Sequence, residues 1–76
     1  MSSNNDFVIG KVYERIAEFS YVVGGGTEIE SGQRILILQK EIFSVYNQTS
    51  YYVKFLFNGK IYNEEFDTAN WENISD

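Results

Sequence analysis

The sequence contains neither cysteine nor histidine in its 76 residues. Without cysteine, the chain has no disulfide scaffold, no thiolate zinc site and no thiol nucleophile. Without histidine, it lacks the commonest general base and the commonest transition-metal ligand. These two absences exclude many classes of enzyme and metalloprotein. We therefore expect a protein that is not an enzyme and that binds no metal or cofactor.

Positive charge and long apolar runs are also scarce. Eleven acidic residues against six basic ones give a net charge of −5. Proteins that bind phosphates directly usually have a basic surface, so we expect no direct contact with nucleic acid. The longest apolar run, residues 35–38, is far shorter than the ~20 residues that span a bilayer. Residues 1–6 carry no basic segment of a signal peptide, which predicts a cytoplasmic protein without a membrane partner.

Proline is absent, whereas asparagine, isoleucine, phenylalanine and tyrosine are frequent. This usage is typical of AT-rich genomes, including those of many phages and low-GC bacteria; a phage protein would work in the host cytoplasm. Aromatic side chains make up 17% of the chain, with six Phe, six Tyr and one Trp. A chain this short buries only about 60% of the surface of its unfolded form, so a dense aromatic core is needed to stabilise its single domain.

Two segments near the end of the chain predict a β-hairpin. Residues 51–57 and 60–66 are rich in aromatic and β-branched side chains. The Asn-Gly pair between them is the strongest short hairpin signal, because both residues adopt positive φ in a type I′ turn. This turn places Phe55 opposite Tyr62 and gathers six apolar residues on one face of the hairpin. That face consists of Tyr51, Val53, Phe55, Phe57, Tyr62 and Phe66.

The rest of the chain predicts further short strands. We expect strands at residues 16–23 and 34–39, a short closing strand at 72–75, and mostly loop at 41–50. Residues 7–15 fit a helix or a strand. Such a pattern indicates an all-β fold, either a small barrel or a sandwich, and a barrel leaves no strand edge exposed. The expected organisation is an N-terminal extension of uncertain structure (1–15) and one domain (16–76).

Four segments, in order, resemble the SH3 family over about residues 17–75. Residues 17–21 (AEFSY) resemble its opening Ala-Leu-Tyr-Asp-Tyr signature, and Glu28 precedes a glycine-led strand at 32–38. Tyr51 and Tyr52 lie where the family has paired tryptophans. Residues 66–71 resemble its closing segment, which forms one 3₁₀ turn before the last strand. The resemblance implies an SH3-like barrel of about five short antiparallel strands.

The resemblance also implies a function, the binding of extended proline-rich peptides between aromatic ridges. Acidic residues in the loops of such domains pair with a basic residue of the ligand. By position, the acids are Glu28 and Glu30, and Asn70 is a hydrogen-bonding residue. The aromatic residues of the ridge are Phe19, Tyr21, Tyr51 and Trp71. We therefore expect a protein-binding module that uses an aromatic surface patch.

Two other functions remain open. Acidic residues crowd the end of the chain at Glu64, Glu65, Asp67, Glu72 and Asp76. Such a surface mimics phosphates in an inhibitor of a host nucleic-acid enzyme, or it simply keeps the domain soluble. These acids lack the loop spacing of a calcium site, and nothing in the sequence supplies a pocket for paired catalytic carboxylates. The apolar stretch at residues 7–16 suggests instead an assembly protein that forms homo-oligomers through this segment.

Overall fold

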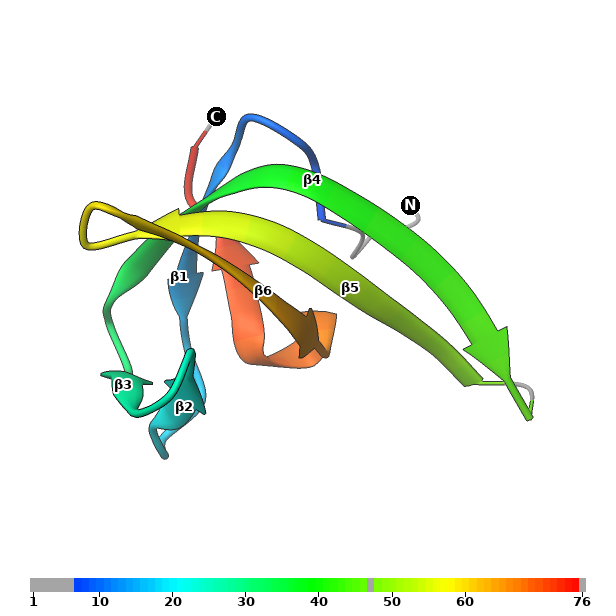
Figure 1. Cartoon of the computed structure of the whole chain (residues 1–76), viewed down its shortest axis with the longest axis horizontal. Helices are drawn as coiled ribbons and strands as arrows, with labels where there is room; N and C mark the ends of the chain where they lie inside the picture. Colours follow the sequence, from blue (N-terminus) through cyan, green and yellow to red (C-terminus); the bar gives the residue numbers. More distant parts are fainter. Residues whose placement is uncertain (1–6, 47, 76) are drawn as a thin grey trace.

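The computed structural model describes residues 7–46 and 48–75, which form a fold of strands with a single 3₁₀ turn (Figure 1). The all-β class predicted from the sequence is confirmed, with more strands than the five expected. In chain order the elements are β1 (Val12–Arg15), β2 (Tyr21–Val23), β3 (Thr27–Ile29), β4 (Arg34–Val45), β5 (Gln48–Phe57), β6 (Lys60–Phe66), the 3₁₀ turn η1 (Thr68–Asn70) and β7 (Trp71–Asn73).

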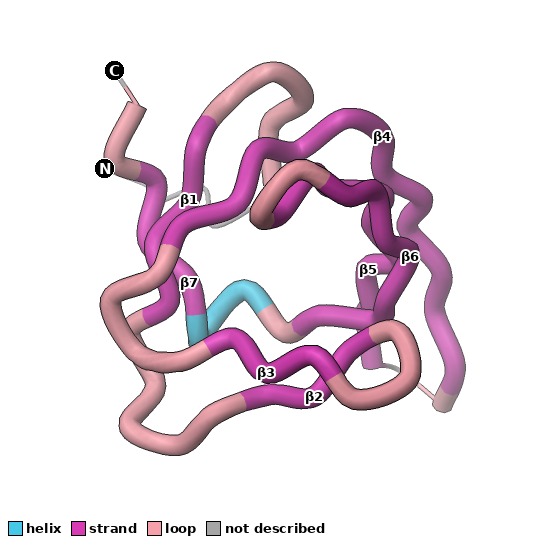
Figure 2. The backbone as a smooth tube through the Cα atoms, turned by 60° about the vertical axis from the view of Figure 1, so that its left-hand side comes forward, coloured by secondary structure: helices cyan, strands magenta, loops and turns pink. Residues whose placement is uncertain are grey.

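The strands form two separate sheets. Five of them pair in the order β6-β5-β4-β1-β7, and β2 pairs only with β3. Every pairing is antiparallel. The large sheet curves strongly, and the β2–β3 hairpin lies across its open side (Figure 2). The hydrogen-bonded ladder does not run all the way round, because β2 and β3 contact the large sheet through side chains rather than through strand pairing.

The β5–β6 hairpin has the register predicted from its turn. Phe57 pairs with Lys60 and Phe55 with Tyr62. Asn58 and Gly59 have φ values of 56° and 83°, as a turn with two left-handed residues requires. The predicted face is the inner one, with Val53, Phe55, Phe57 and Phe66 buried and Tyr51 and Tyr62 packed against the core.

Residues 41–50, expected to be mostly loop, belong largely to β4 and β5, so that prediction was wrong. The two strands pair from Leu36 and Leu56 out to Val45 and Gln48, with a register shift between Ile37 and Gln39. Their hairpin extends well beyond the other strands (Figure 1). The polar residues of this segment are not typical of strands. They nevertheless pair, because backbone hydrogen bonds between neighbouring strands do not depend on side-chain type.

Residues 7–15 contain a strand rather than a helix. β1 lies inside the large sheet, between β4 and β7. Phe7, before this strand, is fully buried in the core. The expected division of the chain at residue 15 therefore does not follow the structure, because residues 12–15 are an inner strand of the sheet that contains the later strands. Residues 1–6 lie outside the described part of the chain.

The strand expected at residues 16–23 is much shorter than predicted, since only Tyr21–Val23 forms β2. Residues 16–20 connect β1 to β2 without strand pairing. The closing strand begins at Trp71, one residue earlier than expected, and ends at Asn73. The 3₁₀ turn implied by the SH3 resemblance is present immediately before it.

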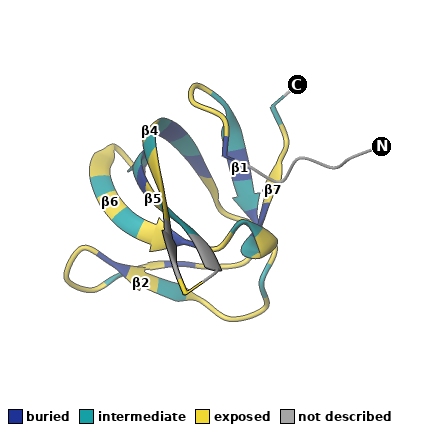
Figure 3. Ribbon diagram, turned by 90° about the vertical axis from the view of Figure 1, so that its right-hand side faces the viewer, coloured by how far each residue is buried: buried dark blue, intermediate teal, exposed yellow. Residues whose placement is uncertain are grey.

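The core is mainly aromatic, as its composition predicts. Phe66 lies at its centre, with ring centroids 5.0 Å from Phe55, 4.7 Å from Trp71 and 5.3 Å from Tyr21. Stretches of β1, β4, β5 and β7 are buried (dark blue in Figure 3). The aliphatic part of the core consists of Val23, Ile29, Ile35, Ile37 and Val53. No helix in the described ranges 7–46 and 48–75 has the length and hydropathy to cross a membrane.

Candidate functional site

The most unusual group in the structure is the side chain of Arg15, which is only 2% exposed and is the one buried charged residue among those described. Its guanidinium carbon lies 5.3 Å from the ring centroid of Phe19, 5.5 Å from that of Tyr21 and 5.3 Å from that of Trp71. The Nε–H group donates to the main-chain oxygen of Phe19 at 3.1 Å. Three aromatic residues thus surround one cation.

The alternation of β1 explains why this arginine points inward. Tyr13 and Arg15 lie on the same face of the strand, two residues apart, and both are buried. Arg15 is also paired with Trp71 across the β1–β7 ladder. Each favourable cation–π contact contributes about 0.5–2 kcal/mol, which offsets part of the cost of removing the charge from water.

A cavity of about 160 Å³ lies beside this cluster. Its lining combines apolar rings, one cation, one amide and two acidic residues. The lining residues are Arg15, Tyr21, Glu65, Phe66, Asp67, Asn70 and Trp71. A concave site with a few convergent polar groups among aromatic rings is typical of a ligand-binding pocket.

Burial and, to a smaller extent, nearby charges shift the pKa of two groups at the cavity. Burial raises the pKa of Tyr21, and the carboxylates of Glu64 and Glu65 raise it further, whereas Arg15 lowers it. Burial lowers the pKa of Arg15, and its attraction to Tyr21 acts in the opposite direction. The Tyr21 hydroxyl donates to the main-chain oxygen of Glu65 at 3.2 Å, which joins β2 to β6.

The structure brings together four of the residues predicted from the sequence. Phe19, Tyr21 and Trp71 surround Arg15, and Asn70 lines the cavity beside them. Phe19 is 65% exposed, whereas Trp71 is only 6% exposed and packs on Phe66. Trp71 is therefore a core residue that also contacts Arg15. Phe19 is the aromatic residue of the site that a partner can reach.

The other predicted residues lie elsewhere. Tyr51 packs against Phe7, with ring centroids 5.8 Å apart, and is not part of the cavity lining. Glu28 is exposed on β3 opposite Val22, and Glu30 is exposed just after that strand. The acidic residues that line the cavity are instead Glu65 and Asp67, which were expected to belong to an acidic patch.

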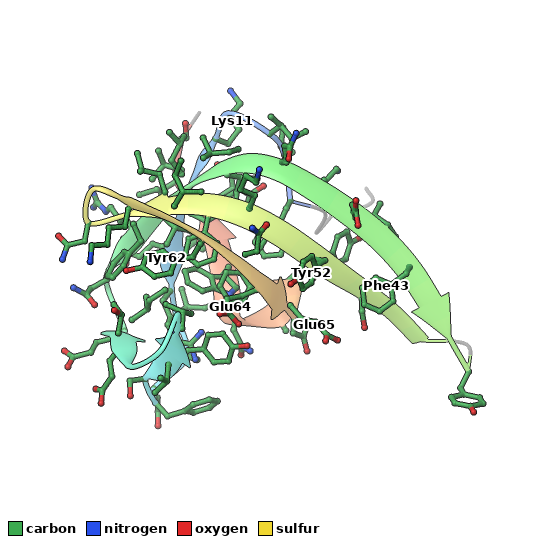
Figure 4. The ribbon with its side chains drawn as sticks, viewed as in Figure 1. Lys11, Phe43, Tyr52, Tyr62, Glu64 and Glu65 are labelled. Atoms are coloured by element: carbon green, nitrogen blue, oxygen red, sulfur yellow. The ribbon has the colours of Figure 1, made fainter. Side chains whose placement is uncertain are left out.

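The acidic residues near the end of the chain differ in their surroundings. Glu64 points towards the β2–β3 hairpin, where its Oε2 atom accepts the Gly24 N–H at 3.2 Å (Figure 4). Asp67 accepts the Ala69 N–H at 3.0 Å and caps the 3₁₀ turn. Glu72 is exposed on β7, and Asp76 lies outside the described residues. Two of these carboxylates therefore have local structural partners.

The β2–β3 hairpin is fixed over the core by close packing at its turn. Gly24 has φ of +50°, and a Cβ atom at this position would lie 2.5 Å from the ring of Tyr62. The Tyr62 hydroxyl is 3.4 Å from Thr27 Oγ1 on β3. Tyr62 and Glu64 thus reach from β6 to both sides of the turn (Figure 4). This packing explains the glycine-rich turn and helps to hold Tyr21 at the cavity.

A second cavity, of about 300 Å³, lies beside the long hairpin. It is lined by Gln39, Lys40, Glu41, Tyr52, Lys54 and Asn63. Lys40 reaches across to the main-chain oxygen of Phe7 at 2.7 Å. The Arg15 cavity is lined by three aromatic residues, whereas this one has a single aromatic residue, Tyr52. Among the described residues, no three acidic side chains gather in a way that could hold a metal ion.

Sequence reasoning missed Arg15, although a signal for it was present. In the apolar stretch of residues 7–23, Lys11 and Arg15 are the exceptions to an alternating pattern of inward-facing residues. A charged residue at an inward position of a strand marks a buried polar site. Which rings surround Arg15 could not be read from the sequence, because Trp71 is 56 positions further along the chain.

Comparisons of the chain with known protein families, with curated proteins and with solved structures find no match. A function for this protein must therefore be inferred from the geometry of the site.

Proposed function

We propose that this protein is a non-enzymatic binding module with an SH3-like architecture, and that it holds a segment of a partner protein at the Arg15 cavity. The observation that carries the proposal is the gathering of Tyr21, Asn70 and Trp71 at one cavity, with the exposed ring of Phe19 on the Arg15 guanidinium beside it. Aromatic residues are enriched where binding energy is concentrated, and concave sites exclude water from contacts.

The single 3₁₀ turn before β7 supports the architecture, since the SH3 resemblance implies it at this place. The curved sheet and the β2–β3 hairpin across its open side also fit such a small barrel-like fold. Fold alone does not fix a ligand. The ligand preference follows from the cavity, where aromatic surface lies next to carboxylates, as suits an extended segment with a basic side chain.

The test is selection of random phage-displayed peptides on the native protein, followed by measurement of their affinity. We expect selected peptides to contain a basic residue, and we expect Phe19→Ala to weaken them about tenfold. Phe19 is a suitable site because its ring is mostly exposed, so its removal leaves the core intact. Trp71→Ala is unsuitable, because it would also remove a core residue.

The matched control is Ile61→Ala, which removes a side chain of similar exposure, 61%, from the outer face of β6. This variant should bind the selected peptides as the native protein does. Equal affinity of the Phe19→Ala variant and the native protein would contradict the proposed site. A separate array of proline-rich peptides, with and without a basic residue, then shows whether proline contributes.

A further inference from the structure

The guanidinium of Arg15 has more hydrogen-bond donors than the protein uses. An arginine side chain carries five N–H donors. Its Nε–H group is bonded to Phe19, but neither terminal nitrogen has a hydrogen-bond acceptor or an ion-pair partner in ranges 7–46 and 48–75. The aromatic rings interact with the charge without accepting ordinary N–H bonds. Buried donors in proteins almost always have a partner, so an acceptor from outside is indicated.

The cavity has room for such an acceptor. Arg15 forms part of its lining, and its volume is about 160 Å³. A liquid water molecule occupies about 30 Å³, so the space takes an amide group with a few attached carbons. Asn70 and the Tyr21 ring lie on the same lining and could contact the remainder of such a group.

The surrounding charges decide which acceptor fits. The carboxylates of Glu64 and Glu65 are close enough to raise the pKa of Tyr21, and Asp67 also lines the cavity. Two acidic residues, Glu65 and Asp67, therefore line the cavity together with one buried cation. An anionic ligand would be repelled by this excess of negative charge, whereas a neutral oxygen would not. The same acids favour a positive group next to that oxygen.

We propose that the free N–H groups of Arg15 bind a main-chain carbonyl oxygen of a peptide, beside a lysine or arginine whose cation pairs with Glu65 and Asp67. This inference rests on the proposed function and specifies its ligand chemistry. Arginine suits the role because its planar group can present two parallel donors while its faces remain stacked on rings.

The experiment is NMR observation of the arginine Nε–H signals during titration with small probes. The chain contains only two arginines, so Arg34 is an internal reference. Arg34 is exposed and lies 3.4 Å from a carboxylate oxygen of Glu14. The probes are N-acetyl-lysine N-methylamide, N-acetyl-alanine N-methylamide and acetate. The lysine probe has amide carbonyls and a cation, the alanine probe has amide carbonyls without a charge, and acetate is an anion.

We expect the lysine probe to shift the Arg15 signal in a saturable way, with a Kd of about 1–10 mM, and to leave the Arg34 signal unchanged. The alanine probe should bind about fivefold more weakly, and acetate should not shift Arg15. In the Glu65→Gln, Asp67→Asn double variant, the lysine probe should lose its advantage over the alanine probe. Asn retains the ability to cap the 3₁₀ turn, so the fold should be kept.

Two results would overturn the inference. A shift of Arg15 by acetate at lower concentration than by the lysine probe would identify an anion site. No shift with any probe would mean that the guanidinium is a structural group only. Failure of the proposed function gives a different result. The selected peptides would then bind the Phe19→Ala variant as tightly as the native protein, while the Arg15 signal would still shift with the lysine probe.

Discussion

The two halves of the β4–β5 hairpin differ sharply in what covers them. In the half next to the β5–β6 turn, Ile35, Ile37 and Phe55 are almost completely buried. Beyond the register shift, Ile42 and Phe43 on the same strand pair are exposed, although the backbone ladder continues without a break from Gln39 to Val45. Phe43 and Tyr52 lie on this outer half (Figure 4). Pairing therefore extends the strands, but burial depends on other segments of the chain.

The cover of the inner half comes from distant parts of the sequence. The β2–β3 hairpin contributes Val23 and Ile29 to the core, and β7 contributes Trp71. On the outer half, Phe7 packs its ring on Tyr51 and accepts a hydrogen bond from Lys40 through its main-chain oxygen. Stability is therefore expected to be concentrated where the second sheet closes over the first. Substitutions in the two halves, and at the contacts that hold the cover in place, test this expectation.

Phe55→Ala and Phe43→Ala remove the same side chain from the two halves. Phe55 is 0% exposed and contacts the rings of Phe66 and Tyr62, so we expect a loss of about 3–5 kcal/mol in the free energy of unfolding. Phe43 is 39% exposed, and its loss should cost less than about 1 kcal/mol. Urea unfolding followed by tyrosine and tryptophan fluorescence measures both. Similar losses for the two variants would refute the contrast.

Gly24→Ala tests the contact that holds the β2–β3 hairpin over the inner half. The new methyl group would collide with the Tyr62 ring at a position whose φ is already positive. We expect the free energy of unfolding to fall by about 2 kcal/mol or more, because of backbone strain and displacement of the hairpin. The measurement is the midpoint and slope of urea unfolding.

Gly25→Ala is the matched control, because Gly25 has φ of +83° and no atom lies within 4 Å of the place that the new methyl group would occupy. The Gly25→Ala variant has the backbone strain without the collision, so we expect it to lose about 1 kcal/mol in the free energy of unfolding. A Gly24→Ala variant no less stable than Gly25→Ala would show that Tyr62 moves aside freely and that the hairpin is not fixed by this contact.

Tyr21→Phe removes the hydroxyl by which β2 contacts β6. Of these substitutions, we expect it to change the free energy of unfolding least. Burial, followed by Glu64 and Glu65, raises the pKa of Tyr21 above its ordinary value of about 10. The folded state thus holds this proton more tightly than the unfolded state. The resulting stability is fully present below about pH 10 and is lost as the pH rises through the raised pKa.

The free energy of unfolding of the native protein and of Tyr21→Phe should be compared between about pH 8 and pH 11. The native protein should lose more stability over this range than the variant, because the variant lacks the ionisable hydroxyl of Tyr21. A constant difference across the range would mean that the Tyr21 proton does not stabilise the folded state.

Local sequence was sufficient to specify the β5–β6 hairpin. Asn58 and Gly59 set the turn, the turn set the register, and the alternation of Val53, Phe55 and Phe57 chose the inner face. The aromatic composition also indicated that a short chain could build a core. These features depend on residues close together in the chain, so their signals can be read in order.

Long-range packing, in contrast, set the extent of β4, the place of β1 and the Arg15 site. The outer part of β4 is a strand because β5 pairs with it, and β1 is an inner strand because β4 and β7 flank it. The site needs Arg15 from β1 and Trp71 from β7, which only the antiparallel pairing of these strands brings together. Such pairing leaves no local pattern, so the sequence could mark Arg15 as a charge within an apolar strand pattern but could not show which rings surround it.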